Sequence, residues 1–200
     1  MKILAASDIH GDKRHAEKLA EQAVKENVDL VVLCGDLLFN EIETDGLMAP
    51  FKKRNLPVAL IPGNHETSAT TNFLAEFYKL YNLHGYYLKL GDVGIFGCGG
   101  GNVAGHAYQI NEEDITKILK KGHDKIKDMK TQIMVTHIHP SGGLIEKMSF
   151  KGSPAIAKAV EDFKPNIHLC GHIHECEGME EIIKKTRVMN VGKKGKIIEV

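Results

Sequence analysis

Apolar positions along the chain fall into short continuous runs that alternate with longer amphipathic segments. Residues 2–7 form an apolar run and residues 28–34 form a β-branched one, the pattern of strands that are covered on both faces. Between these runs, from Asp12 to about Asn27, apolar residues recur with the helical period, and Asp12 can cap the helix. This alternation favours an α/β layered fold with a mainly parallel inner sheet.

The same alternation continues through most of the chain. Further strands are predicted at residues 57–61, 132–136 and 166–170, and further helices at residues 44–55, 68–82, 112–129 and 153–163. In the helix at 68–82, the large apolar residues are expected to face the core: Phe73, Leu74, Phe77, Leu80 and Tyr81. Strand and helix thus follow one another at the spacing of an α/β protein.

Two segments depart from the alternation of strand and helix. Residues 86–96 have the pattern of a strand, a Gly91-Asp92 turn and a second strand, which predicts a hairpin and makes the sheet mixed. Near the end of the chain, residues 186–191 and 196–200 flank Gly192 to Gly195, a pattern that predicts a closing hairpin. Because the chain has no repeat, linker or low-complexity tract, we expect a single domain over residues 1–200.

Composition limits the partners and the location of the protein. Lysine plus arginine and aspartate plus glutamate both number 26, so no overall positive field attracts nucleic acid. The first apolar run reaches Asp8 too early for a secretory signal or a membrane span, so we expect a cytoplasmic protein without a membrane partner. The four cysteines form no close C-x-x-C pair and are expected to be reduced, mostly buried thiols.

Polar side chains with metal-binding groups follow directly after several predicted strands. In open α/β sheets, functional sites form where the carboxyl ends of the strands meet, so these side chains are expected to converge at one edge. They come from five separate segments: Asp8 with His10, Asp36, Asn64 with His65, His137, and His172 with His174. Each i, i+2 pair in an extended segment points to one side, and although a single pair is often incidental, the five segments together indicate a metal centre.

The chemistry of these groups limits the choice of metal. Carboxylates, imidazoles and an amide without any thiolate suit manganese, iron, zinc, nickel or cobalt rather than copper(I) or an iron–sulfur cluster. The number of candidate ligands exceeds the needs of one ion. We therefore expect two divalent metal ions as cofactors.

The order of these motifs resembles the calcineurin-like metallophosphoesterases over nearly the whole chain. The matching blocks are Asp8-x-His10, Gly35-Asp36, Gly63-Asn64-His65-Glu66, Thr136-His137 and Gly171-His172-x-His174. The resemblance implies a sandwich of two mixed β-sheets flanked by helices. It also implies that Asp8, His10 and His174 bind one metal ion, that Asn64, His137 and His172 bind the other, and that Asp36 bridges them.

The resemblance further implies a metal-dependent phosphatase or phosphodiesterase. Two cations a few ångströms apart clamp the attacking and leaving oxygens and acidify a shared water, so that a bridging hydroxide attacks phosphorus in line. His65 follows a ligand and matches the family histidine that donates a proton to the leaving oxygen or steadies the phosphate. The expected substrate is a small phosphomonoester or phosphodiester, contacted by Asn64, His65 and His139.

Several residues near these motifs allow two interpretations. Glu66 stands where many members of the family carry aspartate, and we interpret it as a support for His65 or for a loop. His139 either faces the substrate or is a hydrogen-bonded support residue. The glycines from Gly97 to Gly101, with Asn102, lack the lysine of a phosphate-binding loop and form either the rim of the site or a simple connection. The remaining histidines are expected to be structural: His15, His84, His106, His123 and His168.

Two other functions compete with phosphate-ester hydrolysis. Some relatives with a similar Gly-Asn-His-Glu block are nucleases, although the balanced charge of this chain argues against a nucleic-acid partner. Other members of the superfamily have lost metal ligands and serve as protein-binding scaffolds, whereas no ligand position is lost here. Self-association is left open, because the sequence does not locate exposed apolar patches.

Overall fold

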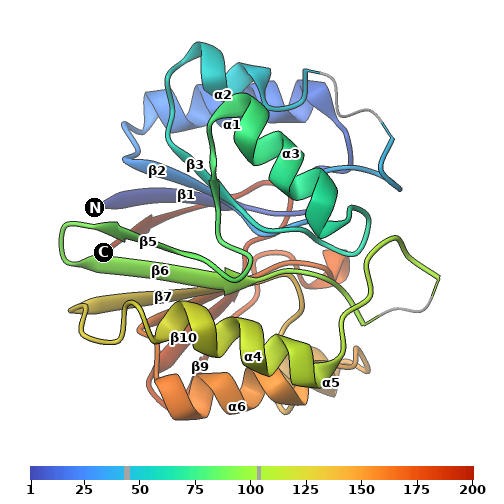
Figure 1. Cartoon of the computed structure of the whole chain (residues 1–200), viewed down its shortest axis with the longest axis vertical. Helices are drawn as coiled ribbons and strands as arrows, with labels where there is room; N and C mark the ends of the chain where they lie inside the picture. Colours follow the sequence, from blue (N-terminus) through green and yellow to red (C-terminus); the bar gives the residue numbers. More distant parts are fainter. Residues whose placement is uncertain (43–45, 103–104) are drawn as a thin grey trace.

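Two mixed β-sheets pack face to face at the centre of the protein, as a computed structural model of residues 1–42, 46–102 and 105–200 shows (Figure 1). The first sheet contains, in spatial order, β11 (Lys196–Glu199), β1 (Lys2–Ala6), β2 (Leu30–Leu33), β3 (Val58–Leu60) and β4 (Tyr81–Asn82). The second contains β5 (Tyr87–Leu90), β6 (Val93–Cys98), β7 (Thr131–Thr136), β8 (Ile167–Cys170), β10 (Thr186–Asn190) and β9 (Glu180–Ile183). The fold class implied by the resemblance is confirmed.

Helices cover the outer face of each sheet. Against the first sheet lie α1 (Lys13–Lys25), α2 (Ala49–Lys53) and α3 (Ser68–Tyr78), and against the second lie α4 (Glu112–His123) and α6 (Pro154–Phe163) (Figure 1). Shorter elements, α5 (Leu144–Lys147) and the 3-10 turn η1 (His174–Cys176), lie in the connections after β7 and β8. None of the helices in the described ranges has the length and apolar character needed to cross a bilayer.

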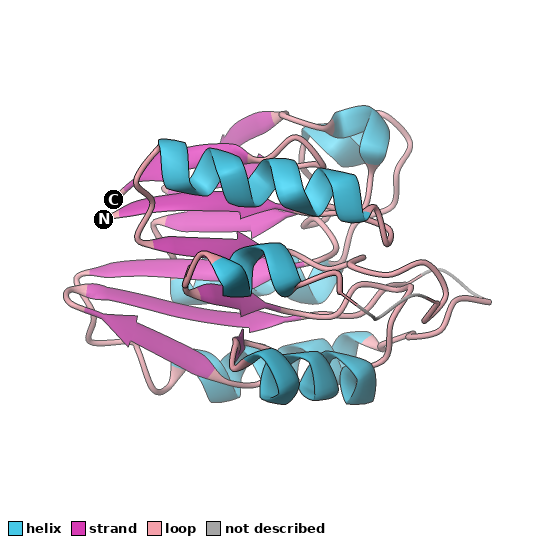
Figure 2. Cartoon of the chain, turned by 90° about the horizontal axis from the view of Figure 1, so that it is seen from above, coloured by secondary structure: helices cyan, strands magenta, loops and turns pink. Residues whose placement is uncertain are grey.

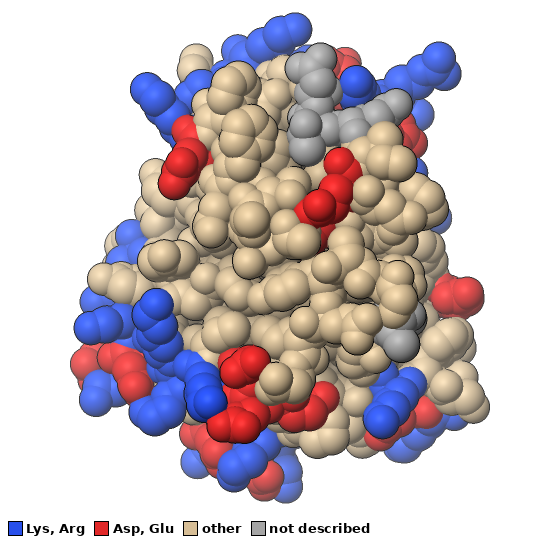
Figure 3. Space-filling model, turned by 45° about the vertical axis from the view of Figure 1, so that its right-hand side comes forward, with Lys and Arg blue, Asp and Glu red and all other residues tan. Residues whose placement is uncertain are grey.

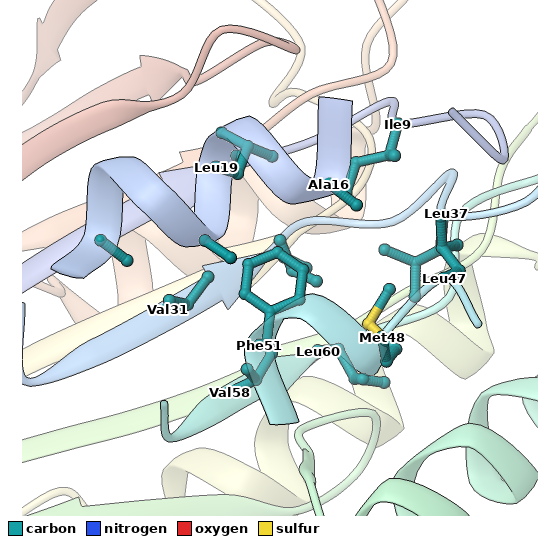
Figure 4. Close-up of a cluster of buried hydrophobic side chains, with 14 of the residues drawn as sticks. Ile9, Ala16, Leu19, Val31, Leu37, Leu47, Met48, Phe51, Val58 and Leu60 are labelled. Atoms are coloured by element: carbon teal, nitrogen blue, oxygen red, sulfur yellow. The ribbon is translucent and has the colours of Figure 1, made fainter. Parts of the chain in front are cut away.

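The layered arrangement explains why the inner strands β2 and β3 are apolar at every position. In β1, Leu4 packs outward with α1 and its neighbours, whereas Ile3 and Ala5 pack between the two sheets. Since successive side chains of a strand point to opposite faces, a central strand of this sandwich buries all of them. Figure 4 shows the outer cluster under α1 and α2, where the ring of Phe51 lies among aliphatic side chains.

The end of α3 differs from the prediction. The helix stops at Tyr78 because Lys79 adopts the left-handed conformation (φ 57°), and the chain continues into the short strand β4. Leu74 is buried, but Phe73, Phe77 and Tyr81 are 54%, 67% and 46% exposed, so the prediction that they face the core is wrong. The helix buries the narrow stripe of Thr71, Leu74 and Ala75, and the rings of Phe73 and Phe77 stack on each other on the outer face.

Other boundaries are shorter than predicted. The helix expected at residues 44–55 spans only Ala49–Lys53, and residues 44 and 45 lie outside the described residues. The helix expected at residues 112–129 ends at His123, after which the chain forms turns. The cap on α1 is confirmed, because the side chain of Asp12 accepts a hydrogen bond from the backbone N–H of His15 at 2.9 Å. All four cysteines are buried free thiols, as expected.

The closing hairpin predicted at the end of the chain is wrong. β10 pairs in parallel with β8 in the second sheet, whereas β11 pairs antiparallel with β1 in the first. Between them the chain crosses from one sheet to the other through Gly192 and Gly195, whose φ angles are 58° and 75°. The hairpin partner of β10 is β9, which the sequence analysis missed. This crossing brings the two chain ends together, with the Met1 amino group 2.6 Å from the Val200 carbonyl oxygen (Figure 2).

Candidate functional site

The polar side chains expected to bind metal gather at one end of the sandwich. β1, β2 and β3 are parallel to one another, as are β7 and β8, and the chain leaves all five strands on the side that lies at the right of Figure 1. Each candidate ligand lies in the first few residues after one of these strands. The edge predicted from the strand pattern is therefore the place where the structure brings these groups together.

The backbone at this edge turns sharply at the candidate ligands themselves. Asp8, His10, Asp36 and His172 have φ angles of 59°, 51°, 50° and 71°, in the left-handed region that residues with a Cβ seldom adopt. Each such residue costs of order 1–3 kcal/mol and persists only where the surroundings hold it. Here the N–H of Asp8 donates to the Gly35 carbonyl at 3.0 Å and that of His10 to the Asp36 carbonyl at 2.9 Å.

Two glycines let the turns approach each other closely. A Cβ on Gly63 would lie 2.0 Å from Oδ1 of Asp36, and a Cβ on Gly171 would lie 1.9 Å from Oγ of Ser7. Both distances are far below van der Waals contact, so a larger residue at either position would push the turns apart. The glycines of the Gly63-Asn64 and Gly171-His172 motifs are thus required by the convergence of the loops.

Asp8, His10 and His174 form the first cluster. Nε2 of His10 lies 3.1 Å from Nε2 of His174, and His174 Nε2 lies 3.4 Å from Oδ1 of Asp8. One ligand atom from each residue lies within 4.8 Å of the others. Oδ2 of Asp8 accepts the backbone N–H of His172, whereas Oδ1 is buried without a hydrogen-bond donor among the described residues. A buried anionic oxygen facing two imidazole nitrogens is the environment that a cation would satisfy.

Asn64, Asp36, His137 and His172 form the second cluster. Nε2 of His137 lies 3.1 Å from Oδ1 of Asn64 and 3.4 Å from Oδ2 of Asp36. The ring of His172 meets that of His137 edge to face, with centroids 4.9 Å apart. Nδ1 of His137 donates to the Cys34 carbonyl at 2.8 Å, which fixes the ring so that Nε2 faces the cluster.

Asp36 lies between the two clusters. Its Oδ2 lies 3.8 Å from Nε2 of His10 in the first cluster and 3.4 Å from Nε2 of His137 in the second. Its Oδ1 accepts the backbone N–H of His65 at 3.0 Å. The carboxylate is buried, and its position is the one that a bridging ligand would need.

The electrostatics of the site keep both carboxylates ionised. Burial opposes ionisation of Asp36, but the neighbouring His137 imidazole outweighs it and lowers the Asp36 pKa. Burial likewise opposes ionisation of Asp8, yet His174 and His137 hold its pKa below the ordinary value. Burial disfavours the charged form of His137, and the charge of Asp36 overcomes this and raises its pKa to about 10. Because Nδ1 of His137 already donates to Cys34, the added proton sits on Nε2, the atom for which a cation would compete.

His65 forms one wall of the site, beside Asp36. Its Nε2 lies 3.9 Å from Oδ2 of Asp36, and its Nδ1 donates to Oδ1 of Asn40 at 2.8 Å. The ring stacks on Phe39 with centroids 5.0 Å apart and meets His106 edge to face at 4.7 Å. Burial lowers the pKa of His65. The residue predicted to be catalytic is therefore held on three sides, with Nε2 turned toward the carboxylates.

Three residues of this wall, His106, Asn40 and Phe39, were not predicted from the sequence. His106 was set aside as structural, but its Nδ1 accepts a hydrogen bond from the side-chain amide of Asn64 at 2.9 Å. Asn40 and Phe39 also contact His65, and neither belongs to a recognised motif. For His106 a signal existed, since it follows the glycine-rich loop whose role as a rim of the site had been considered.

The other histidines set aside make structural contacts. Nε2 of His168 is 2.7 Å from the Thr136 hydroxyl, and His123 stacks on Phe163 at 4.2 Å between centroids. His15 contacts the Lys193 carbonyl, and His84 accepts the N–H of Gly99. His139 is buried, and its Nε2 donates to the Phe150 carbonyl at 3.0 Å, the placement expected of a support residue rather than of one facing a substrate.

Glu66 supports loops rather than His65. Its buried carboxylate accepts the N–H groups of Gly63 at 2.7 Å, Leu37 at 3.2 Å and Leu38 at 3.1 Å. These amides belong to the turns after β2 and β3, which carry Asp36 and Asn64. Burial and the charge of Asp36 raise the pKa of Glu66 to about 7 despite these hydrogen bonds.

The glycine-rich loop packs on the site as a rim. Its amides are engaged within the protein, since Gly100 N–H donates to the Pro62 carbonyl and Gly101 N–H to the Tyr108 carbonyl. A Cβ on Gly101 would lie 2.4 Å from Cβ of Asn64, so glycine permits this close approach. The loop therefore borders Asn64 and does not present its amides as an anion cradle.

Charged side chains are sparse at the centre of the face that includes this edge. In Figure 3 the lysine and arginine side chains lie around the margin of the molecule, and the middle of the view is mostly uncharged. A protein that tracks a nucleic-acid backbone usually presents a continuous basic stripe. The view in Figure 3 has none.

Comparison with known proteins gives one family. The model of the calcineurin-like phosphoesterase family matches residues 1–176. An uncharacterised protein of Methanocaldococcus jannaschii is 30% identical, over 91% of this chain and 84% of its own length. Solved structures with the same fold include a Thermus thermophilus protein (TM-score 0.80, 20% identity, covering 96% of this chain and 90% of that one). A dimetal phosphatase from Danio rerio also shares the fold (TM-score 0.63, 12% identity, 96% and 87% covered).

Proposed function

The chain belongs to the calcineurin-like phosphoesterase family and is a phosphoesterase, and we propose that it hydrolyses small phosphomonoesters or phosphodiesters at a centre of two divalent cations. The observation that carries the proposal is the position of Asp36 between two clusters of ligand-type side chains. We further propose that residues 1–200 act as one metallophosphoesterase domain in the cytoplasm.

The side chains present fit such a centre. Asp8, His10 and His174 would hold the first cation, and Asn64, His137 and His172 would hold the second, with Asp36 shared. Two features support this assignment: Oδ1 of Asp8 is buried and has no hydrogen-bond donor among the described residues, and the Nε2 atoms of His10 and His174 face it. The set contains oxygen and imidazole nitrogen but no sulfur, so manganese, iron, zinc, nickel and cobalt are the candidate metals.

The chemistry that two such cations supply is neutralisation of charge on the phosphoryl oxygens and activation of water for in-line attack. Residues of the protein would supply the proton and orient the groups around the cations. His65, with Nδ1 committed to Asn40, directs Nε2 into the site and would give a proton to the leaving oxygen or steady the phosphate. The Asn64 amide is oriented by His106, which accepts from its Nδ2 and leaves Oδ1 toward His137.

Two other functions are weaker candidates. A nuclease would need contacts to a polyanion, whereas the formal net charge is zero and the face in Figure 3 has no basic stripe. A non-catalytic scaffold would be expected to have lost some ligands, yet every motif position carries a ligand-type side chain.

Metal analysis combined with a substrate panel tests the proposal. The purified protein is loaded with each candidate metal in turn, its metal content is measured, and turnover of p-nitrophenyl phosphate, bis-p-nitrophenyl phosphate and single-stranded DNA is recorded. We expect about two ions per chain and turnover of at least one small ester. Asp36→Asn should lose both ions and turnover, whereas His123→Ala, which alters a ring stacked on Phe163, should keep both. Failure to bind any divalent ion would remove the proposal, and cleavage of DNA alone would favour the nuclease.

A further inference from the structure

Phe39 is an exposed aromatic ring at the mouth of the candidate site. Its ring stacks on His65 with centroids 5.0 Å apart and an interplanar angle of 20°, and it meets the edge of His10 at 5.9 Å. Phe39 is 53% exposed, whereas the side chains of His65 and His10 are only 12% and 18% exposed. The phenyl ring is thus the outermost layer over two imidazoles whose nitrogens face Asp36.

The turn that carries Phe39 is tied firmly to the segment that carries His65. The N–H of Glu41 donates to the His65 carbonyl at 3.0 Å. The Glu41 carboxylate accepts the N–H of Thr67 at 2.8 Å and the hydroxyl of Thr70 at 2.7 Å. Asn40 and Glu41 both have left-handed φ angles, 50° and 60°, a conformation that persists only where the surroundings impose it. The ring is therefore held over His65 before any substrate binds.

The position of His65 defines where a leaving group must extend. If Nε2 of His65 protonates the leaving oxygen, as in the proposed function, the atoms attached to that oxygen would leave the site close to the His65 ring. Phe39 covers part of that ring, and Ile42, which is 62% exposed, lies across the same turn from it in an isolated β-bridge. A leaving group that extends over Phe39 would thus meet an apolar, flat surface, beside the Asn40 side chain that holds His65.

We propose that Phe39 determines specificity by stacking on a planar ring of the leaving group, so that the enzyme prefers phosphate esters of aromatic or nucleoside alcohols. This inference rests on the proposed function of the same site. A flat aromatic face favours offset stacking with another planar ring over contact with an alkyl chain. Stacking of bases on aromatic side chains is worth enough to alter rates about tenfold, which corresponds to ~1.4 kcal/mol.

The test compares esters that differ in the ring but not in the type of leaving alcohol. Benzyl phosphate and cyclohexylmethyl phosphate both release a primary alcohol, ethyl phosphate lacks a ring, and AMP carries a planar base. For Phe39→Ala we expect kcat/KM to fall about tenfold on benzyl phosphate or AMP and less than twofold on ethyl and cyclohexylmethyl phosphate. Phe39→Tyr should restore the preference. Phe77→Ala, which removes an exposed ring stacked on Phe73, should leave all four rates unchanged.

The same assay distinguishes the two kinds of planar leaving group, a nucleoside and a simple aryl group. A loss confined to AMP assigns the ring to a nucleoside, a loss confined to benzyl phosphate assigns it to a simple aryl group, and either result supports stacking. An equal loss on all four esters would show that Phe39 only positions His65, and no loss on any ester would show that it contacts nothing in the reaction; both results overturn the proposal.

The affinity for phosphonates that cannot be hydrolysed tests the stacking role of Phe39 independently of the proposed function. The affinities of metal-loaded wild type and Phe39→Ala for benzylphosphonate and ethylphosphonate are measured by calorimetry. If the protein hydrolyses none of the esters, the proposed function fails, but a selective loss of benzylphosphonate affinity in Phe39→Ala still supports the stacking role. Equal affinity of the wild type for both phosphonates would overturn it.

Discussion

The side-chain amide of Asn64 donates to Nδ1 of His106 at 2.9 Å, a contact between two loops that lie 42 positions apart in the chain. The same amide presents its oxygen to Nε2 of His137 at 3.1 Å. His106 therefore sets which end of the amide faces the second cluster. Partners that orient a metal ligand typically change metal affinity by about 10- to 100-fold when they are removed.

For His106→Ala we expect weaker binding at one of the two proposed metal sites, because the Asn64 amide loses the acceptor that orients it. The dissociation constant of that site should rise by about tenfold or more, while the other site is little changed. Competitive metal titration measures both constants. His15→Ala, whose ring contacts the Lys193 carbonyl, serves as the matched control. Identical titration curves for wild type and His106→Ala would show that the contact does not orient the ligand.

His65→Ala should separate metal binding from turnover. The ring lies close enough to His10 and Asp36 to form a group with them, but the proposed centre assigns His65 to neither ion, so the metal content should stay at the wild-type value. Turnover of the preferred ester should fall by about 10²- to 10⁴-fold, the usual contribution of a proton donor. Metal analysis and steady-state kinetics on the same preparation give the two results. Wild-type turnover in this variant would remove His65 from the mechanism.

Glu66→Ala should destabilise the fold, because the buried N–H groups of Gly63, Leu37 and Leu38 lose their common acceptor. We expect a loss of roughly 2–4 kcal/mol in the free energy of unfolding, measured by urea denaturation. Glu66→Gln keeps one side-chain acceptor oxygen and should lose less. Replacement of the exposed Glu113 by alanine gives a control, since its ion pair with Lys117 is solvated. Equal stability of Glu66→Ala and Glu113→Ala would contradict the role assigned to Glu66.

Glu180 should make stability depend on pH in the acidic range. Hydrogen bonds from Arg187 in β10 and Lys196 in β11 lower the Glu180 pKa from 4.5 to about 2, and the contact with Lys196 links the two sheets. Since the folded-state pKa is depressed, the stabilisation is fully present above pH 4.5 and is lost as the pH falls toward 2. The groups are partly exposed, so we expect only about 0.5–1 kcal/mol.

The comparison of wild type with Glu180→Gln isolates this contribution. The difference in unfolding free energy should be largest near pH 7, should shrink as the pH falls from 4.5 toward 2, and should vanish below pH 2, where the Glu180 carboxyl is protonated in both the folded and the unfolded protein. Urea denaturation at a series of pH values measures it. A difference that grows as the pH falls would have the wrong sign and would exclude the ion pairs as its source.

The sequence by itself determined the positions of the inner strands along the chain and the edge at which the site forms, whereas the short strand β4 and the strand β9 were not predicted. Central strands bury the side chains on both faces, so they appear in the sequence as continuous apolar runs. Strands β1 and β2 could therefore be predicted without knowing which strands they pair with. Because the carboxyl ends of parallel strands meet, Asp8, Asp36 and His137 could be assigned to one place before any distance was known. The motifs proposed to bind metal each span only a few consecutive residues, so they could be recognised in the sequence without the fold.

Only the tertiary structure decided which surfaces those elements meet. A strand after a glycine turn shows the same pattern of apolar residues whether it pairs with the preceding strand or crosses to another sheet. The pairing of β11 with β1 could therefore not be predicted from the residues of β11. The outward face of α3 at Phe73 and Phe77 depends in the same way on what lies beneath the helix. Three residues reach the site through loops: Phe39, Asn40 and His106. The paths of these loops depend on contacts between residues far apart in the sequence, such as those made by Glu66 and Glu41. Such contacts leave no periodic pattern in the sequence from which they could be predicted.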